Sequence, residues 1–481
     1  MRIPFVLLAA LAAAWPYLAP AQPLPELGDA AGAAIAPQTE RRIGESIVRE
    51  IRYRDPAYVD DAEVTDYIDA LGRRLLGAVP GVRQDFEFFA VRDGAINAFA
   101  LPGGFIGVHT GLLTAAESES EVASVLAHEI AHVTQRHIAR LIGAQQQMQL
   151  PSMIALAAAI LIGASRPDLA AGAAAAAQAG MVQTQLSYTR DFEREADRVG
   201  FQTLAAAGFD VHAMPGFFEK MQRQSRLADD GQVPSYLRTH PMTTERIADT
   251  AGRAANSPYR QHLDSLEFHL VRAKLRAESG EPRTAVEHYA AAVRDRRYAS
   301  EAAARYGLVA AQLRAGQARE AQASLAALRA TGASSPMIET LAARVQRAAG
   351  NAPAALATLA QAQQRYPGRL SLAYAYAEAL EQAGRPQEAL AALAGPMRQY
   401  PRDARLRALQ ARNYAALGKR LAQHQAQAEV YVLRGSLPAA IEQLQLAQAA
   451  GDGNFYEQSV VEARLKELRA QHAQEMKDAK R

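Results

Sequence analysis

The hydrophobic pattern near the N-terminus predicts two amphipathic helices. Within residues 40–54, Ile43, Ile47 and Ile51 recur every four residues and so line one face of a helix. Residues 62–76 carry apolar side chains at a similar spacing. Each pattern predicts a helix that packs one apolar face on a core.

Short apolar runs typical of strands follow these helices. Residues 86–91, 96–101 and 105–108 are three such runs, and Pro102-Gly103-Gly104 forms a turn between the last two. We therefore expect a small β-sheet. It can serve for packing alone, or its edge can pair with an extended peptide, as sheet edges often do.

The next predicted helix is more apolar than the first two. Residues 118–141 form one helix or two in sequence, and they contain His128-Glu129-Ile130-Ala131-His132. If the helix continues past His132, His137 falls off the face that His128 and His132 share. His137 is therefore left out of the candidate site.

Two alanine-rich apolar runs come next, at residues 153–164 and 169–179, with Ser165-Arg166-Pro167-Asp168 between them. Each run is shorter than a membrane span. We expect a helical hairpin that packs on the N-terminal domain. The alternative is that residues 153–179 make a peripheral contact with a membrane or a partner.

The second half of the chain repeats. The glycines there are separated by 36, 34, 34 and 34 residues, and they are Gly280, Gly316, Gly350, Gly384 and Gly418. A period of 34 residues with helix, glycine turn and helix is typical of tetratricopeptide repeats, whose superhelix offers a binding surface or is purely structural. The fold class is thus mainly α with a small β-sheet, followed by an α-solenoid.

Length and composition limit the number of domains, the expected partners and the kind of metal site. A chain of 481 residues is too long to fold around a single hydrophobic core. We therefore place an N-terminal domain at 22–260 and a repeat domain at 261–481. The formal net charge of +3 comes without a basic stripe, so nucleic acid is not an expected partner. Cysteine is absent, so a metal site would use histidine and carboxylate ligands.

The first residues are typical of a secretory signal peptide. Arg2 precedes the apolar run 5–14, and Ala19-Pro20-Ala21 provides a cleavage site after Ala21. A membrane anchor is the alternative, but the run is short for a span. We expect residues 1–21 to be removed and the mature chain to be periplasmic or extracellular.

The candidate chemistry lies in His128-Glu129-Ile130-Ala131-His132. Histidines four residues apart on a helix reach one metal ion, and the adjacent Glu129 can act as general base on a metal-bound water. This arrangement is typical of a zinc hydrolase. The alternative is a surface helix with scattered histidines.

A second helical stretch, residues 187–200, supplies carboxylates. Glu193 is the predicted third metal ligand, and Asp197, one turn later, can orient His128 or His132 through the ring nitrogen that is not on the metal. The alternative is an ordinary charged helix face, although Glu193 and Asp197 would then repel each other.

With these motifs the sequence resembles the gluzincin family of HtpX and the CAAX prenyl protease. The signal peptide and repeats resemble its periplasmic, BepA-like branch, although the absent cysteines depart from members with a C-terminal cysteine pair. The resemblance implies that His240, in Thr239-His240-Pro241, is a regulatory fourth zinc ligand. It also implies that Arg246 supports the site, with an oxyanion role as an option, and that Asn97 binds substrate.

The function implied is that of a zinc metalloendopeptidase with one Zn²⁺ per chain and a chaperone-like role in outer-membrane protein assembly. Its expected partners, bound through the repeats, are misassembled outer-membrane proteins and their assembly machinery. Two alternatives stay open: a chaperone or scaffold with a latent zinc site, and a zinc hydrolase that acts on peptidoglycan or lipid.

Overall fold

The computed structural model describes residues 35–82, 84–144, 190–227 and 235–478. The predicted signal peptide and the apolar runs at 153–179 lie outside these residues. The N-terminal half contains the following helices: α1 (Pro37–Arg54), α2 (Ala62–Leu76), α3 (Thr110–Ala115), α4 (Glu119–Thr134), α5 (His137–Ala144), α8 (Arg190–Ala206), α9 (Ala213–Leu227), α10 (Ser235–Thr239) and α11 (Thr244–Ala255).

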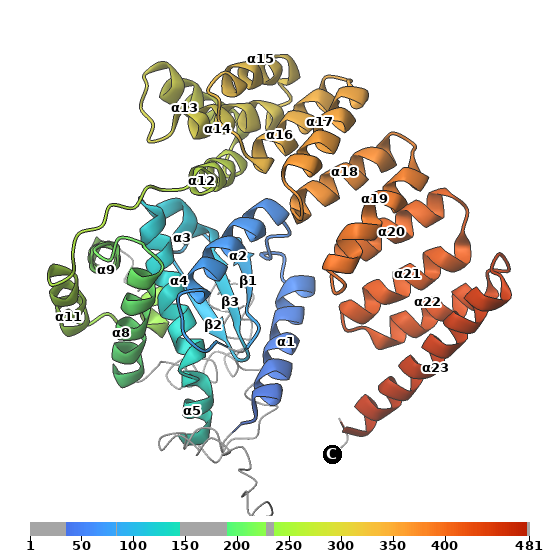
Figure 1. Cartoon of the computed structure of the whole chain (residues 1–481), viewed down its shortest axis with the longest axis horizontal. Coiled ribbons are helices and arrows are strands. Elements are labelled where there is room, and N and C mark those ends of the chain that lie inside the picture. The colour runs from blue at the N-terminus through green and yellow to red at the C-terminus, as the bar shows by residue number, and fades with distance from the viewer. Residues whose placement is uncertain (1–34, 83, 145–189, 228–234, 479–481) are drawn as a thin grey trace, which may run out of the picture.

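A three-stranded sheet lies among these helices (Figure 1). Its strands are β1 (Glu87–Val91), β2 (Ala98–Leu101) and β3 (Phe105–His109), in the order β1-β3-β2. β3 runs parallel to β1 and antiparallel to β2. β2 is therefore an edge strand, and one side of its backbone is not used by the sheet.

The sheet is covered on both faces, which explains why its strands are continuously apolar. Neighbouring side chains on a strand alternate between the two sides, so Phe88 and Phe89 join different hydrophobic clusters. The isoleucines of α1 pack with the Phe89 side of the sheet. Helices α2 and α4 pack on the other side, and the predicted small sheet is confirmed.

The C-terminal half is an array of antiparallel helix pairs. Its helices are α12 (Leu266–Glu278), α13 (Pro282–Arg294), α14 (Glu301–Arg314), α15 (Ala318–Arg329), α16 (Pro336–Ala348), α17 (Ala352–Arg365), α18 (Leu370–Gln382), α19 (Pro386–Gln399), α20 (Ala404–Ala416), α21 (Arg420–Leu433), α22 (Leu437–Ala449) and α23 (Phe455–Asp478).

Glycine makes the turn inside the repeats because the backbone there is left-handed, a conformation that costs other residues energy. Gly350 and Gly384, for example, have φ of +78° and +69°. Gly435, also left-handed, joins α21 to α22 and so shortens the connection between two pairs. The predicted solenoid is confirmed.

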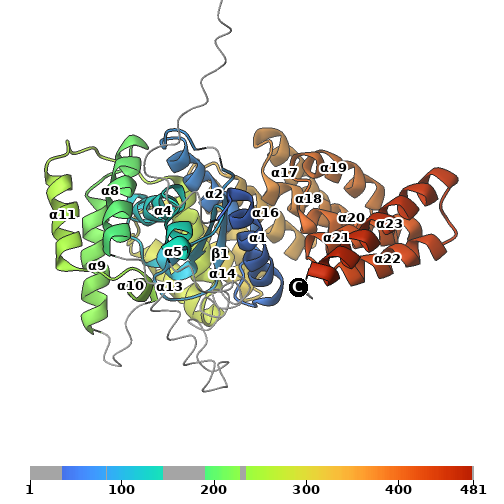
Figure 2. The same cartoon turned by 90° about the horizontal axis from the view of Figure 1, so that it is seen from below.

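The repeats curve around the N-terminal half, with α1 and α2 on the inner side of the arc (Figures 1 and 2). Lys274 of α12 is almost completely buried, and its Nζ lies 2.5 Å from carboxylate oxygens of both Asp61 and Glu63. Ser371 of α18 donates a hydrogen bond to Asp66 over 3.0 Å. The inner surface, expected to be open for binding, is thus partly covered by α2.

One hydrophobic cluster extends across this contact, from Val64 and Ile68 of α2 to Phe268 of α12 and Leu341 of α16. The first repeats therefore share a core with the N-terminal half. The predicted boundary at 260 falls between α11 and α12 and stays a prediction. Within the described ranges, every helix is too short or too polar to cross a bilayer.

Candidate metal centre

Helix α4 carries two of the candidate ligands. Its N-terminus is capped by Ser118, whose hydroxyl accepts a hydrogen bond from the amide of Glu121. His128 and His132 lie one turn apart and are fully buried. Their Nε2 atoms are 3.0 Å from each other, so both imidazoles point into one small volume, as the spacing predicts.

Helix α8 packs against α4 and brings Glu193 to the same place. Its carboxylate oxygens lie 3.5 Å from the Nε2 atoms of His128 and His132. Gly200 permits this approach, because a Cβ atom at that position would lie only 3.0 Å from the backbone nitrogen of His128. The close helix contact therefore depends on a residue without a side chain.

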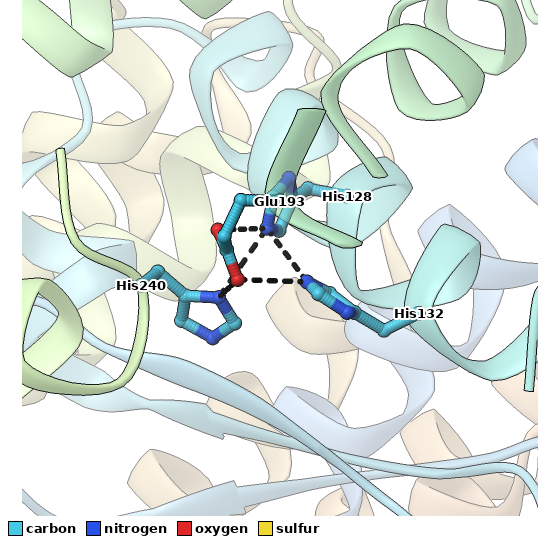
Figure 3. A group of neighbouring side chains, drawn as sticks. All are labelled: His128, His132, Glu193 and His240. Atoms are coloured by element: carbon cyan, nitrogen blue, oxygen red, sulfur yellow. Dashed lines mark hydrogen bonds and ion pairs between the residues drawn. The ribbon is translucent and has the colours of Figure 1, made fainter. Parts of the chain in front are cut away.

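His240, just after α10, completes the group (Figure 3). Its Nδ1 lies 3.0 Å from Glu193 and 3.4 Å from Nε2 of His128. Tyr236, one turn earlier and equally buried, stacks on the imidazole of His240, with the two ring centroids 4.6 Å apart. The sequence reasoning missed Tyr236, although its position four residues before His240 places both on one side of a helical turn.

These four side chains can hold a metal ion. Their ligating atoms all lie within 4.8 Å of one another, and all four residues are buried. Three imidazoles and a carboxylate supply nitrogen and oxygen donors that suit a first-row transition metal. Outside such a site, so many ionisable groups would be costly to bury together.

The group is electrostatically coupled. Burial alone would lower the pKa of His128, but Asp197 and Glu193 outweigh it and raise that pKa to about 9. Burial and the charge of His128 hold the pKa of His132 well below its usual value. Burial acts to raise the pKa of Glu193, yet His240 and His128 hold it well below the usual range. A metal ion would thus compete with a proton at His128.

Glu129 lies beside the group but faces β2. Neither of its carboxylate oxygens accepts a hydrogen bond from a residue that the structure describes. Its Oε1 is 3.5 Å from Nε2 of His240. Burial raises the pKa of Glu129, which the charges of His240 and His128 and the backbone amide of Ala100 only partly offset. A raised pKa makes this carboxylate a stronger base towards a water molecule.

Asp197 and Arg246 contact the candidate ligands on the side away from the metal group. Asp197 lies 3.0 Å from Nδ1 of His128, so it can fix that ring with Nε2 turned to the metal group. Arg246 contacts both oxygens of Asp197, at 2.7 and 2.8 Å, and its Nη1 contacts Glu193 at 2.7 Å and the carbonyl of Pro241 at 2.9 Å. All three guanidinium nitrogens are engaged in these contacts, and an oxyanion role for Arg246 stays a prediction.

Asn97 lies directly before β2 and is nearly buried. Its side-chain Nδ2 is 3.5 Å from Nε2 of His109 on β3, and its backbone carbonyl accepts a hydrogen bond from the backbone amide of His109. The side chain is therefore not part of the four-residue group. A role for Asn97 in substrate binding stays a prediction.

His137 is not among the four candidate ligands, but it lies closer to them than helical periodicity predicts. Helix α4 ends at Thr134, and Arg136 adopts a left-handed φ of +52° and forms an ion pair with Glu40. The chain changes direction, so helical periodicity no longer applies. His137, at the start of α5, turns back and places its Nδ1 2.8 Å from Nδ1 of His132. It therefore contacts one of the candidate ligands from outside the four-residue group.

Comparisons with known proteins agree with this geometry. The profile of peptidase family M48 matches residues 63–254, and a tetratricopeptide repeat profile matches residues 346–412. The beta-barrel assembly-enhancing protease of Escherichia coli K12 is 33% identical over 458 residues, which cover 93% of this chain and 92% of that protein.

Other relatives match over shorter stretches of this chain. The putative beta-barrel assembly-enhancing protease of Vibrio cholerae and the beta-barrel assembly-enhancing protease of Yersinia pestis are 42% and 40% identical to this chain. These matches span about half of each relative, namely 51% and 48% of its length. The mitochondrial metalloendopeptidase OMA1 of Arabidopsis thaliana is 34% identical over 34% of this chain and 30% of that protein. By its one-third identity along nearly the whole of both chains, this protein belongs to the beta-barrel assembly-enhancing proteases, which are metalloproteases of peptidase family M48.

Proposed function

We propose that this chain is a zinc metalloendopeptidase in which His128, His132 and Glu193 hold one Zn²⁺ ion. The observation that carries the proposal is the buried group of ligating atoms within 4.8 Å of one another. Its histidine and carboxylate donors are those that zinc takes in catalytic sites. Bound zinc would polarise the scissile carbonyl and acidify a water molecule.

Glu129 is the proposed general base. It sits next to a ligand in sequence, and its carboxylate makes no hydrogen bond within the described residues. Because burial raises its pKa, it can take a proton from the attacking water and return it to the leaving amine. A purely structural metal site would have no use for this group.

The edge strand β2 is the proposed place for the substrate backbone. Among the described strands it pairs with β3 alone, and α4 packs against it. An extended peptide that adds to this edge would run past Glu129, because that carboxylate lies close enough to the backbone of Ala100 on β2 for it to affect the pKa of Glu129. Asn97, just before β2, is placed to contact such a peptide.

His240 is the proposed regulatory ligand. Its Nδ1 faces the metal group at 3.0 Å from Glu193, so it can take the fourth zinc position and keep water out. The same observation favours a second candidate function: a chaperone or scaffold with a latent zinc site. The two differ in whether His240 leaves the metal in the working protein.

The proposed substrates are misassembled outer-membrane β-barrel proteins. We place this chain in the periplasm, with its own signal peptide cleaved after Ala21. The names of the full-length relatives support this assignment. The repeats are the proposed docking region for these proteins and their assembly machinery. Because α2 covers part of the inner surface, the exposed aromatic residues at the end of the array, Phe455 and Tyr456, are candidate contacts.

The catalytic proposal is tested with Glu129→Gln. It should keep about one zinc ion per chain but lower the rate of cleavage of an unfolded outer-membrane protein by about 10²- to 10⁴-fold, because it removes a base and not a ligand. Glu193→Ala should lose both zinc and activity. Metal analysis and a proteolysis assay measure this, and full activity in Glu129→Gln would contradict the proposal.

The regulatory proposal is tested with His240→Ala in the same assay. If His240 keeps the enzyme latent, its removal should raise cleavage of a generic unfolded substrate while zinc is retained. Lower activity with zinc retained would instead favour a role for His240 in binding substrate or its oxyanion.

The docking proposal is tested with Phe455→Ser combined with Tyr456→Ser. These exposed residues support no core, so peptidase activity should not change, while co-purification with outer-membrane assembly proteins should fall. Tyr259→Ser, at a similarly exposed aromatic residue between the two halves, is the matched control. Unchanged co-purification in the double variant would exclude this surface as the contact.

A further inference from the structure

The two histidine ligands on α4 are supported in different ways. His128 meets a carboxylate directly, at 3.0 Å from Asp197. The Nδ1 atom of His132 instead lies 2.8 Å from Nδ1 of another histidine, His137. Nε2 of His137 in turn lies 3.1 Å from Oε2 of Glu195 on α8. His132 is therefore connected to a carboxylate through a second imidazole.

This chain of contacts fixes where each proton resides. A metal ion at Nε2 of His132 uses the lone pair there, so the proton of that ring is on Nδ1 and needs an acceptor. Nδ1 of His137 accepts only if its own proton is on Nε2. That proton points at Glu195, a carboxylate that can only accept. One carboxylate thus determines the tautomers of both rings.

The chain of contacts is also rigidly held. His137 is fully buried, and its ring stacks on Phe192 with centroids 4.6 Å apart and planes 8° from parallel. Glu195 is held from its other side by Arg140, whose Nη1 lies 2.7 Å away. Arg140 also lies over the ring of Phe192. Helices α5 and α8 therefore clamp His137 in one orientation.

We infer that His137 and Glu195 are positioning residues that present Nε2 of His132 to the metal through a carboxylate–imidazole–imidazole relay. Partners of this kind make a histidine ligand more basic and fix its ring. The inference rests on the proposed function in one respect, namely that His132 binds the metal through Nε2. Neither residue touches substrate or metal, so their effect is on metal binding.

The test compares variants of the full chain by zinc affinity, measured by competition with a chromophoric chelator, and by the visible spectrum of the Co²⁺-loaded protein. His137→Phe keeps a stacked ring but offers no acceptor, so zinc should bind about 10- to 100-fold more weakly. The Co²⁺ bands should shift because the orientation of His132 is lost.

Two conservative variants separate the relay from simple packing. His137→Asn offers an oxygen near the position of Nδ1, so it should recover most of the zinc affinity, to within about threefold of the wild type. Glu195→Gln still offers an acceptor but lacks the charge, so its zinc affinity should fall by less than about tenfold. His212→Phe, which removes an exposed histidine paired with Asp210, should change nothing.

Wild-type affinity and an unchanged Co²⁺ spectrum in His137→Phe would overturn the relay and leave the proposed function intact. If His137→Phe does not fold, the other two variants decide: an affinity in His137→Asn more than tenfold below that of Glu195→Gln would overturn it. A wild-type chain that binds neither zinc nor Co²⁺ would refute the proposed function, and the relay with it.

Discussion

The metal centre and the repeat array use polar side chains in opposite ways. Every residue from Glu119 to Val133 of α4 is buried, and its ionisable side chains other than Glu129 meet polar partners inside the protein. The repeat helices bury mainly alanine and leucine. Apart from Lys274, at the contact with α2, their ion pairs are at least partly exposed, as with Arg412 and Glu381, whose side chains are 53% and 26% exposed. One region depends on specific buried partners and the other on a repeated apolar pattern.

This difference predicts where substitutions matter. A buried charge that loses its partner leaves the other charge uncompensated, which costs several kcal/mol. An exposed pair is solvated and contributes about 0–1 kcal/mol. We therefore expect the metal centre to tolerate few changes in its polar groups, and the repeats to respond mainly to changes in shape and backbone conformation.

The largest effect is expected from Arg246→Met. It leaves the buried carboxylates of Asp197 and Glu193 without their shared cation, so the free energy of unfolding should fall by about 3–5 kcal/mol. The matched control in the repeats is Arg464→Met, which breaks a partly exposed pair with Glu429 and should cost under about 1 kcal/mol. Chemical denaturation measures both, and equal losses would break the comparison.

A smaller effect is expected from Gly200→Ala. Its Cβ would lie 3.0 Å from the backbone nitrogen of His128, so α8 must move away from α4. Overpacking of this kind costs about 1–3 kcal/mol. Because α8 carries Glu193 and Asp197, zinc affinity should fall too, by about tenfold.

Gly384→Ala provides the contrast in the repeats. No described atom lies within 4 Å of the added Cβ, and the strain comes only from φ of +69°. We expect a loss of about 1–2 kcal/mol from the left-handed backbone, with unchanged zinc affinity. Thermal unfolding and the chelator competition test both variants, and a zinc effect in Gly384→Ala would show that the repeats control the centre.

The smallest effect is expected at the contact between α2 and the repeats. Burial raises the pKa of Asp66 from 3.8 to about 6, although the hydrogen bond from Ser371 opposes this. Between about pH 4 and pH 6 the unfolded chain has lost this proton and the folded chain keeps it, so stability falls as pH rises. Asp66→Asn stays neutral, so it should stabilise the chain by about 1 kcal/mol at pH 7.5 and by nothing at pH 4.

The control for this prediction is Asp69→Asn, one turn later on α2, where the carboxylate pairs with the exposed Arg73. It should not raise stability at pH 7.5. The measurement is the difference in unfolding temperature between the two pH values. A gain from Asp66→Asn that is equal at both would refute the pH argument.

The sequence by itself determined the local features of both regions. Four-residue spacing on an apolar helix places His128 and His132 on one face, and a period of 34 residues with left-handed glycines makes the helix pairs. The strands and the helices α1, α2 and α4 also follow from local periodicity. In all these cases the information lies within a few residues, or recurs along the chain.

Only the tertiary structure decided which distant groups meet. Arg136 forms an ion pair with Glu40, almost one hundred residues away in sequence, and the left-handed turn at Arg136 returns His137 to His132. The inner surface of the repeats meets α2 through Lys274 and Ser371, which no repeat pattern predicts. Periodicity describes one element at a time, whereas these contacts depend on how several elements pack, because a buried polar group must find its partner wherever the fold places one.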